Sequence, residues 1–459
     1  MSFARGRPRR LLSTHLHASG SMIFASRRAR IQTMANSESR AIEQTIFPNG
    51  LVVMTDSMPH VRSVSVGIWI RSGSRREPAD LNGISHFIEH MVFKGTGRRS
   101  AEDIAREVDR VGGMLDAFTA KEMVCFNTRV LDEHLPIAFD VLADMLLDPR
   151  FPEQEIARER SVILEEIRMV EDDPEDLVHE IFAKNFWGTH PLGRPILGTS
   201  ESVGRFDRPI LEGWFRRWYT PNNMIITAAG HVSHPQILAL VGPRFGERVS
   251  AGESHAENPP APQAEIAARS KAELEQVHLC LGVPAHPMSD PRRYTAALLN
   301  NILGSGMSSR LFQNIREKQG LAYAVFSEAN HYHDAGVLSV YAGTSLDTLE
   351  RLVESVAVEF RDLKQNVVTE EELCRAKDNL KGATLLSLES AGSRMSDLAR
   401  QYLYYGRYIP PEDRIAQMES VSREEILALA QEMFRSDRVS AAIVGDLNGF
   451  ALTPAHLSF

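Results

Sequence analysis

The organisation of this chain follows from two similar stretches of sequence, Asn223-Met-Ile-Ile-Thr-Ala-Ala-Gly230-His231 and Arg438-Val-Ser-Ala-Ala-Ile-Val-Gly445-Asp446. Each is an apolar run of strand length that ends at a glycine, which is typical of a buried strand followed by a turn. A second pair agrees in order and spacing, since Glu155-Ile-Ala-Arg158-Glu-Arg160 parallels Glu372-Leu-Cys-Arg375-Ala-Lys377. The offsets are 215 and 217 residues. We therefore expect two halves of common design.

The boundary between these halves is indicated by composition. Residues 246–269 are rich in Gly, Ser, Pro and Ala, as linkers are. We expect the halves to span 41–245 and 270–459, with 246–269 as the linker. Both show strands and helices without regular alternation, which favours an α+β fold with a mainly antiparallel sheet packed against helices in each half. The helical patterns cover 86–93, 131–147 and 152–170 in the first half, and 295–303, 346–363 and 369–386 in the second.

The composition excludes several protein classes. Hydrophobic residues make up 43% of the 459 residues and charged residues 24%, as in ordinary globular proteins. No run approaches the roughly 18 consecutive apolar residues that a membrane span requires. The three cysteines, Cys125, Cys280 and Cys374, form no CxxC pair. A disulfide scaffold and a cysteine-rich metal site are therefore excluded, and a reducing compartment is expected.

The N-terminal residues 1–40 differ from the rest. Seven arginines and no acidic residue precede Ser37, and without them the net charge of −9 becomes −16. This acidic body argues against nucleic-acid binding. The Arg-rich segment is typical of a mitochondrial transit peptide, but an unstructured tail, or sequence ahead of a start at Met22 or Met34, explains it as well. We exclude 1–40 from the fold and expect a bacterial cytoplasmic protein, or a mitochondrial matrix protein if the segment is a transit peptide.

The chemistry is expected at His86-Phe-Ile-Glu89-His90. On a helix, residues i and i+4 share one face, so both imidazoles can reach one metal ion. Glu89 lies close to that face and is the expected general base. This HxxEH order is the reverse of HExxH. Zinc suits two imidazoles plus an oxygen ligand, so one Zn²⁺ per chain is expected. The alternative to a metal site is an amphipathic helix with two surface histidines beside a glutamate, which would show the same spacing.

A catalytic zinc site needs a third protein ligand, and the candidates are the glutamates of the helical stretch Glu159-Arg-Ser-Val-Ile-Leu-Glu165-Glu166. Glu159 and Glu166 are seven residues apart and share one helical face. One of them could bind the metal while the other orients a ligating histidine. A glutamate-rich helix with a solvated face is the alternative.

The residues around the motif, Asn82-Gly-Ile-Ser-His86-Phe-Ile-Glu89-His90-Met-Val-Phe-Lys-Gly-Thr96, resemble the signature of the pitrilysin-type (M16) inverzincin peptidases. The resemblance is strongest to the mitochondrial processing peptidase β subunit and its bacterial relatives, and it covers about 41–450. It implies a third ligand about 76 residues after His90, which is Glu166, and it implies that Glu159 supports a ligating histidine.

The resemblance also implies substrate contacts. Gly112-Gly-Met-Leu-Asp-Ala117-Phe118-Thr119 is similar to the edge strand that pairs with substrate backbone. Arg316 and Tyr323, in Arg316-Glu-Lys-Gln-Gly-Leu-Ala-Tyr323, resemble an element that reaches the bound peptide and stabilises the oxyanion. Asp176 and Glu180, spaced i,i+4, match acids that select arginine upstream of the cut. Without the resemblance, the simplest interpretation of 112–119 is an ordinary hairpin strand. Arg316 would then be a surface charge and Tyr323 a half-buried aromatic residue, and the two acids would cap a helix.

The second half lacks the motif, because a shift of 211 residues places His86, Glu89 and His90 on Ala297, Asn300 and Asn301. The resemblance therefore implies a zinc metalloendopeptidase in which one half is catalytic and the two halves form a clam-like chamber around an extended or unfolded peptide. A homodimer, or a heterodimer with a related subunit, is expected. The alternatives are a non-catalytic scaffold subunit of the same family and a peptidase that is active only with a partner chain.

Overall fold

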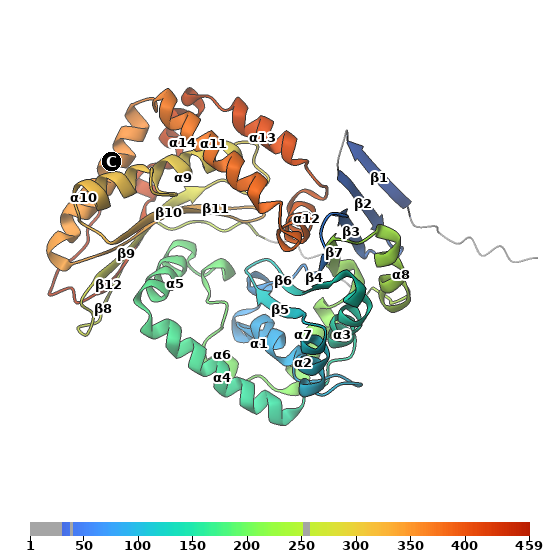
Figure 1. Ribbon diagram of the computed structural model, residues 1–459. Coiled ribbons are helices and arrows are strands. Elements are labelled where there is room, and N and C mark those ends of the chain that lie inside the picture. The colour runs from blue at the N-terminus through green and yellow to red at the C-terminus, as the bar shows by residue number, and fades with distance from the viewer. Residues whose placement is uncertain (1–29, 37–39, 251–257) are drawn as a thin grey trace, which may run out of the picture.

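The structure is a computed structural model that describes residues 30–36, 40–250 and 258–459. The chain forms two sheets, each covered by helices, and the second half lies above the first in Figure 1. No helix within the described ranges has both the length and the apolar composition needed to cross a membrane.

The first sheet has seven strands in the order β1-β2-β3-β7-β4-β6-β5. All neighbours are antiparallel except β3 and β7. The strands are β1 (Arg30–Asn36), β2 (Arg40–Ile46), β3 (Val52–Ser57), β4 (Ser63–Ile70), β5 (Met114–Thr119), β6 (Val124–Leu131) and β7 (Met224–Gly230).

The second sheet has five strands in the order β10-β11-β9-β12-β8, and only β12 and β8 are parallel. The strands are β8 (Ile266–Ser270), β9 (Val277–Ala285), β10 (Ala324–His331), β11 (Gly336–Thr344) and β12 (Ser440–Gly445). This order repeats β5-β6-β4-β7-β3 of the first sheet, including the one parallel pair. The expected α+β fold of two related halves is therefore confirmed.

The helices also correspond between the halves. The first half contains α1 (Ile84–Val92), α2 (Ala101–Arg110), α3 (Leu135–Leu147), α4 (Glu153–Asp172), α5 (Pro174–Trp187), α6 (Ser200–Gly204), α7 (Arg208–Trp218) and α8 (His234–Phe245). The second contains α9 (Arg293–Leu303), the π-helix η6 (Phe312–Lys318), α10 (Leu346–Gln365), α11 (Glu370–Ser387), α12 (Ala391–Tyr405), α13 (Pro411–Ser420) and α14 (Arg423–Met433). The helix expected from residue 131 begins at Leu135, because β6 continues to Leu131.

The sheets extend beyond the boundaries expected from composition. Strand β1 and the first residue of β2 lie before residue 41, in the segment that we placed outside the fold. Strand β8 begins inside the expected linker 246–269 and ends at Ser270, the first residue of the expected second half. The residues of β8 are half-buried or exposed, so its sequence lacks the apolar signal of a buried strand, and pairing with β12 supplies the missing information. Residues 1–29, 37–39 and 251–257 lie outside the described residues.

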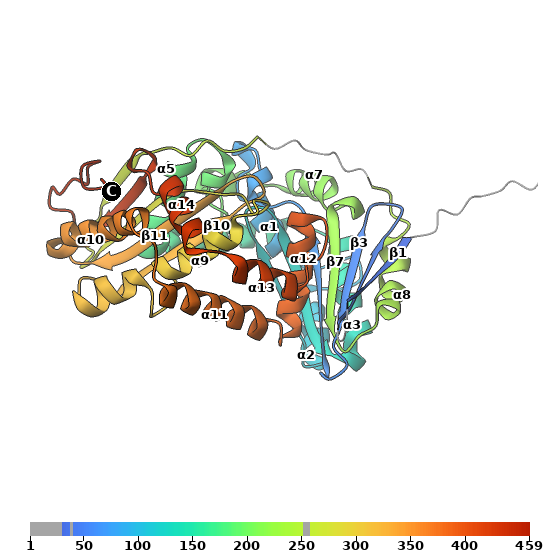
Figure 2. The ribbon, with the colours of Figure 1, turned by 90° about the horizontal axis from the view of Figure 1, so that it is seen from above.

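Each half covers one face of its sheet with a helix from the other half. Helix α5, from the first half, packs on β9 and β12, where Val178 and Phe182 join a buried cluster with Cys280 and Val444. Helix α12, from the second half, packs on β3, β4 and β7, as Figures 1 and 2 both show. The two halves therefore exchange equivalent helices, since α5 follows α4 as α12 follows α11.

A glycine in the middle of each sheet receives the exchanged helix. A Cβ atom added to Gly282 on β9 would lie 2.7 Å from Cζ of Phe182, and one added to Gly67 on β4 would lie 2.8 Å from Sδ of Met395. The two glycines are 215 residues apart, as the repeated strands are. Close packing of α5 and α12 therefore requires the absence of a side chain at these two positions.

The substitution Gly282→Ala tests this packing. The added methyl group must displace Phe182, whose ring is held between α5 and β9, so the free energy of unfolding should fall by about 1–3 kcal/mol. Gly213→Ala is the matched control, because a Cβ at this position in α7 meets no atom within 4 Å. It should be neutral or stabilise the protein by roughly 0.5–1 kcal/mol. Denaturant unfolding followed by circular dichroism measures both changes, and equal stability of the two variants would contradict the packing argument.

Candidate metal centre

The helix that carries the HxxEH motif is fixed at its N-terminus by a buried carboxylate. Helix α1 begins after Gly83, whose φ of +94° favours glycine, and a Cβ there would lie 2.5 Å from the carbonyl oxygen of Leu197. Glu77 accepts hydrogen bonds from the backbone N–H groups of Gly83 (2.7 Å) and Ser85 (2.8 Å) and from the side chain of Asn82 (3.0 Å). Glu77 thus satisfies donors that the first turn of a helix leaves unpaired.

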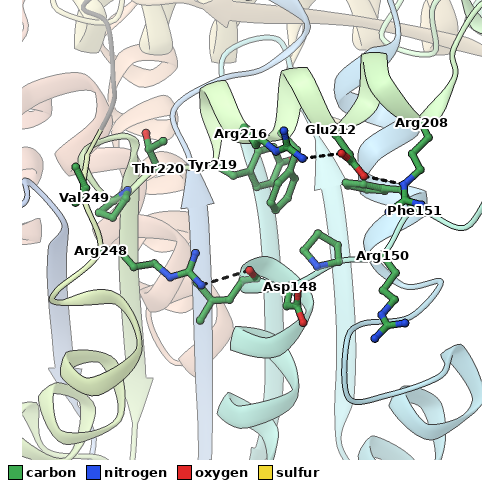
Figure 3. Close-up of a pocket in the computed structure, with 14 residues that line it drawn as sticks. Asp148, Arg150, Phe151, Arg208, Glu212, Arg216, Tyr219, Thr220, Arg248 and Val249 are labelled. Atoms are coloured by element: carbon green, nitrogen blue, oxygen red, sulfur yellow. Dashed lines mark hydrogen bonds and ion pairs between the residues drawn. The ribbon is translucent and has the colours of Figure 1, made fainter.

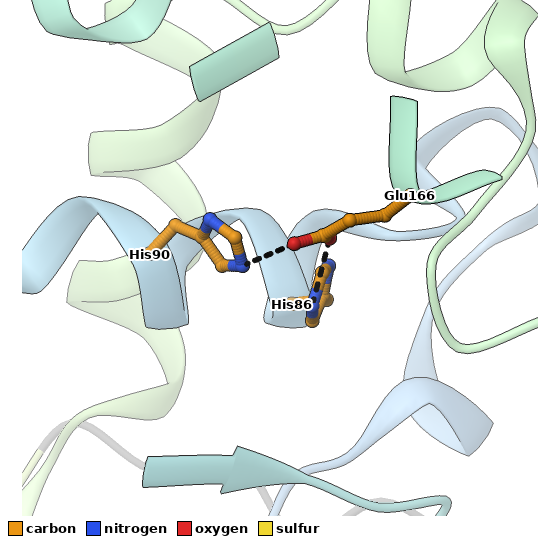
Figure 4. A group of neighbouring side chains, drawn as sticks. All are labelled: His86, His90 and Glu166. Carbon is orange, nitrogen blue, oxygen red and sulfur yellow. Dashed lines mark ion pairs between the residues drawn. The ribbon is translucent and has the colours of Figure 1, made fainter. Parts of the chain in front are cut away.

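The structure brings His86, His90 and Glu166 together. His86 and His90 project from one face of α1 toward Glu166 on α4 (Figure 4). The Nε2 atom of each histidine lies 3.8 Å from a carboxylate oxygen of Glu166. Within the described part of the chain, these three side chains form the one group of His, Cys, Asp and Glu residues with a geometry suited to a metal ion.

The donor set and its spacing fit zinc. Two ligand atoms that each lie roughly 2.1 Å from a tetrahedral zinc ion are about 3.4 Å apart, close to the observed 3.8 Å. Oε2 of Glu166 is buried without a hydrogen-bond partner, as expected for a metal ligand. Burial, together with the charge of His90, lowers the pKa of His86 to about 4, so its imidazole is neutral near pH 7. Neutral imidazole is the form that ligates metals.

Glu159 orients one of these histidines. Its Oε2 lies 3.0 Å from Nδ1 of His90, and its Oε1 lies 2.7 Å from Nζ of Lys94. The hydrogen bonds from Lys94 and His90 outweigh the effect of burial and hold the pKa of Glu159 below its usual value. A carboxylate at Nδ1 directs Nε2 of His90 toward the metal position. Glu165, by contrast, points to solvent and pairs with Arg168.

Glu89 lies beside the metal position and accepts a hydrogen bond from the hydroxyl of Thr119, the last residue of β5. Burial raises the pKa of Glu89, and the Thr119 hydroxyl opposes this rise. A carboxylate with a raised pKa is a better proton acceptor than an ordinary one, and the Thr119 hydroxyl holds it in place.

A pocket of about 550 Å³ joins part of the metal centre to the residues that were predicted to bind substrate. His86 and Glu89 line one part of the pocket, and Asp176 and Glu180 of α5 line another. Ala117 and Phe118 of β5 also face it. Strand β5 is at the edge of its sheet and pairs only with β6 among the described strands, so its outer edge is open to an added strand.

The two residues predicted from the second half lie apart from this group. The Arg316 guanidinium stacks over the rings of Phe312 and Tyr323, with 4.7 Å and 4.9 Å to the ring centroids. Tyr323 is 79% exposed. Neither side chain lines the pocket that contains His86 and Glu89. Their role toward substrate stays a prediction.

The equivalent helix of the second half carries no ligand at the matching positions. Ala297, Asn300 and Asn301 lie on α9, and the Asn301 side chain donates to Oδ1 of Asn379 on α11 at 2.9 Å. An amide hydrogen bond there replaces the histidine–carboxylate contact between α1 and α4.

Another cavity, of about 640 Å³, lies on the outer side of the first half and contains none of the predicted residues (Figure 3). Arg208 and Arg216 both pair with Glu212 along helix α7, and Arg248 donates to the carbonyl oxygen of Leu147. Among the described residues, this cavity contains no histidine, and its one glutamate is already paired with two arginines.

The sequence analysis missed the roles of three residues: Glu77, Lys121, and Thr119, which it named only as the end of the edge strand. Thr119 and Lys121 also line the pocket. Glu77 precedes the motif by nine residues, and Thr119 and Lys121 belong to a separate hairpin. Only the proximity of Glu77 to a glycine-initiated helix gave any signal, since a carboxylate near a helix N-terminus is favourable.

Comparison with known proteins identifies the family of the chain. The family description "Insulinase (Peptidase family M16)" matches residues 52–200, and "Peptidase M16 inactive domain" matches residues 205–380. The protein named uncharacterized zinc protease YmxG of Bacillus subtilis is 41% identical over 402 residues, which cover 88% of this chain and 98% of that protein. An uncharacterized zinc protease of Streptomyces coelicolor is 39% identical over 91% of this chain and 93% of its own length. The chain belongs to peptidase family M16.

Two solved structures have the same fold. A protease from Helicobacter pylori superposes with a TM-score of 0.83 at 22% identity, over 88% of this chain and all of that one. A Pseudomonas fluorescens protein described as a peptidase M16 inactive domain gives a TM-score of 0.82 at 22% identity, over 88% and 98%. At this identity the likeness extends to the fold alone.

Substitution of the two adjacent glutamates of α4 tests the ligand set. Glu166→Gln should lose most of its bound zinc, because a neutral amide oxygen is a poor substitute for a carboxylate ligand. Glu165→Gln is the matched control, since Glu165 is exposed and paired with Arg168, and it should retain zinc at the wild-type level. Metal content of the purified proteins by mass spectrometry measures both. If only the Glu165 variant lost zinc, the third ligand would be Glu165 and not Glu166.

Proposed function

We propose that this protein is a zinc metalloendopeptidase. The observation that carries this proposal is the convergence of His86, His90 and Glu166 on one position, with the Glu89 carboxylate beside it and in the same pocket. Membership of peptidase family M16 and relatives named zinc proteases support it.

The residues divide the chemistry among them. His86, His90 and Glu166 would hold the metal, and Glu159 keeps His90 in the ligating orientation. Bound zinc would polarise a carbonyl group and lower the pKa of water. Glu89 takes the proton from the attacking water and gives it to the leaving amine. The Thr119 hydroxyl holds the Glu89 carboxylate for both transfers.

The open edge of β5 favours extended substrates. A peptide strand laid along Ala117 and Phe118 would exchange backbone hydrogen bonds with the edge and bring a peptide bond toward Glu89. Only an unfolded segment has backbone groups free for this pairing, so folded proteins are poor substrates.

A non-catalytic scaffold and a peptidase that needs a partner chain are the competing functions. The scaffold has no need of a complete ligand set. Purified protein with little zinc, and without peptidase activity after zinc is added, would favour the scaffold. Activity that appears only when a related chain is added would favour the partner-dependent enzyme.

The general base provides the direct test of this function. Glu89→Gln keeps the size of the side chain and removes the proton acceptor, so kcat should fall at least about a thousandfold while zinc content stays unchanged. Quenched fluorescent peptides report the rate, and mass spectrometry reports the metal. A variant that cleaves at the wild-type rate would exclude Glu89 as the base.

The acids of α5 support a preference for arginine. Asp176 and Glu180 form no ion pair within 4 Å in the described part of the chain, and both line the pocket next to His86. A guanidinium group pairs well with carboxylates. We therefore expect cleavage near an arginine, typically two residues after it.

The double variant Asp176→Asn, Glu180→Gln should raise KM at least about tenfold for Arg-containing peptides, because a charge-assisted hydrogen bond contributes roughly 1.5–3 kcal/mol. Matched Ala peptides should change little. Glu165→Gln with Asp172→Asn is the control, since it removes the same charge from exposed positions outside the pocket. An equal rise of KM for both peptide sets would remove the basis for arginine selection.

A further inference from the structure

The acidic pocket contains a lysine of the protein itself. Lys121 follows β5 in the turn that leads to β6, and it lines the pocket together with Asp176 and Glu180. Its ammonium group donates a hydrogen bond to the carbonyl oxygen of Arg194, which lies in the opposite wall. Lys121 thus spans the pocket between the hairpin and the loop that follows α5.

Lys121 acts electrostatically on Glu180. No ion pair within 4 Å joins these two described residues, but the ammonium group opposes the rise in the pKa of Glu180 that burial causes. Glu180 in turn opposes the fall in the pKa of Lys121, which burial lowers to about 8. The two groups therefore attract one another across the pocket.

The other cation of the pocket is directed elsewhere. The guanidinium of Arg194 donates to the carbonyl oxygens of Glu77 (2.9 Å) and Thr189 (3.5 Å). Nδ1 of His179 lies 2.8 Å from the carbonyl oxygen of Glu175 and donates to it. Among the described residues that line the pocket, Lys121 is therefore the cation that acts on Glu180, and it shares the pocket with three carboxylates, those of Glu89, Asp176 and Glu180.

We infer that Lys121 is a specificity-determining residue, which partly neutralises Glu180 and so sets how strongly the pocket selects a substrate side chain with one positive charge. This inference rests on the proposed function for the identity of the ligand, a peptide. The ammonium group weakens the attraction of Glu180 for a guanidinium, because like charges in a partly buried pocket repel one another. The natural protein should therefore select arginine less strongly than a protein with the same two acids but without the charge of Lys121.

A purely structural role for Lys121 is the alternative. The hydrogen bond to Arg194 could serve only to join the hairpin to the opposite wall, and loss of the lysine would then weaken the binding of every peptide alike. Lys121→Gln separates the two roles, because glutamine keeps a donor for the Arg194 carbonyl oxygen and loses the charge. Lys121→Arg keeps the charge and serves as the control.

The experiment measures binding of two peptides that differ only in one side chain, arginine or citrulline, its uncharged isostere. Each Lys121 variant is made in the Glu89→Gln background so that peptides stay intact, and fluorescence anisotropy gives Kd. We expect Lys121→Gln to raise the ratio of the citrulline Kd to the arginine Kd about tenfold, the effect of one screened charge pair. Lys121→Arg should leave the ratio within about twofold of the parent.

Two outcomes separate this inference from the proposed function. A ratio that is unchanged in Lys121→Gln overturns the inference, even if the protein with Glu89 intact cleaves peptides. A ratio that rises as expected supports the role of Lys121. If zinc-bound protein with Glu89 intact binds peptides but cleaves none, the endopeptidase proposal is overturned, whatever the ratio shows.

Discussion

The packing of each sheet against a helix from the other half is the constraint on which the rest of the structure depends. Helix α5 covers the second sheet and α12 covers the first, each seated at a central glycine, Gly282 or Gly67. A buried ion pair between Arg394 of α12 and Asp56 of β3 adds to the second contact. Each half therefore depends on the other to cover one face of its sheet.

This exchange decides how the pocket is built. The metal position is fixed on α1 and α4, but Asp176 and Glu180 belong to α5, whose opposite face is buried against the second sheet. The hairpin that carries Lys121 also reaches the second half, since Glu122 pairs with Arg75, and Arg75 pairs with Asp334 at the tip of the β10–β11 hairpin. The metal-binding side chains thus belong to the first half alone. The positions of the residues that surround them depend on contacts with the second half.

Burial of charge governs the chemistry of the centre. Glu77 is almost fully buried, and burial raises its pKa, yet three hydrogen bonds from the start of α1 stabilise its carboxylate. The same helix presents His86 in a neutral form to the metal position. A helix that is fixed at its first turn holds its side chains in register, which is what a site with several ligands on one helix requires.

Periodicity and spacing in the sequence determined the α+β class, the internal repeat and the group of His86, Glu89 and His90, because these features depend on residues close together in the chain. Resemblance to a family, rather than spacing, singled out Glu166 from Glu159 and Glu165. Only the tertiary structure decided that α5 and α12 exchange places, that β8 extends the second sheet, and that Glu77, Thr119 and Lys121 surround the centre. These features join segments far apart in the sequence, and such contacts are set by burial and pairing in space, which local composition does not record.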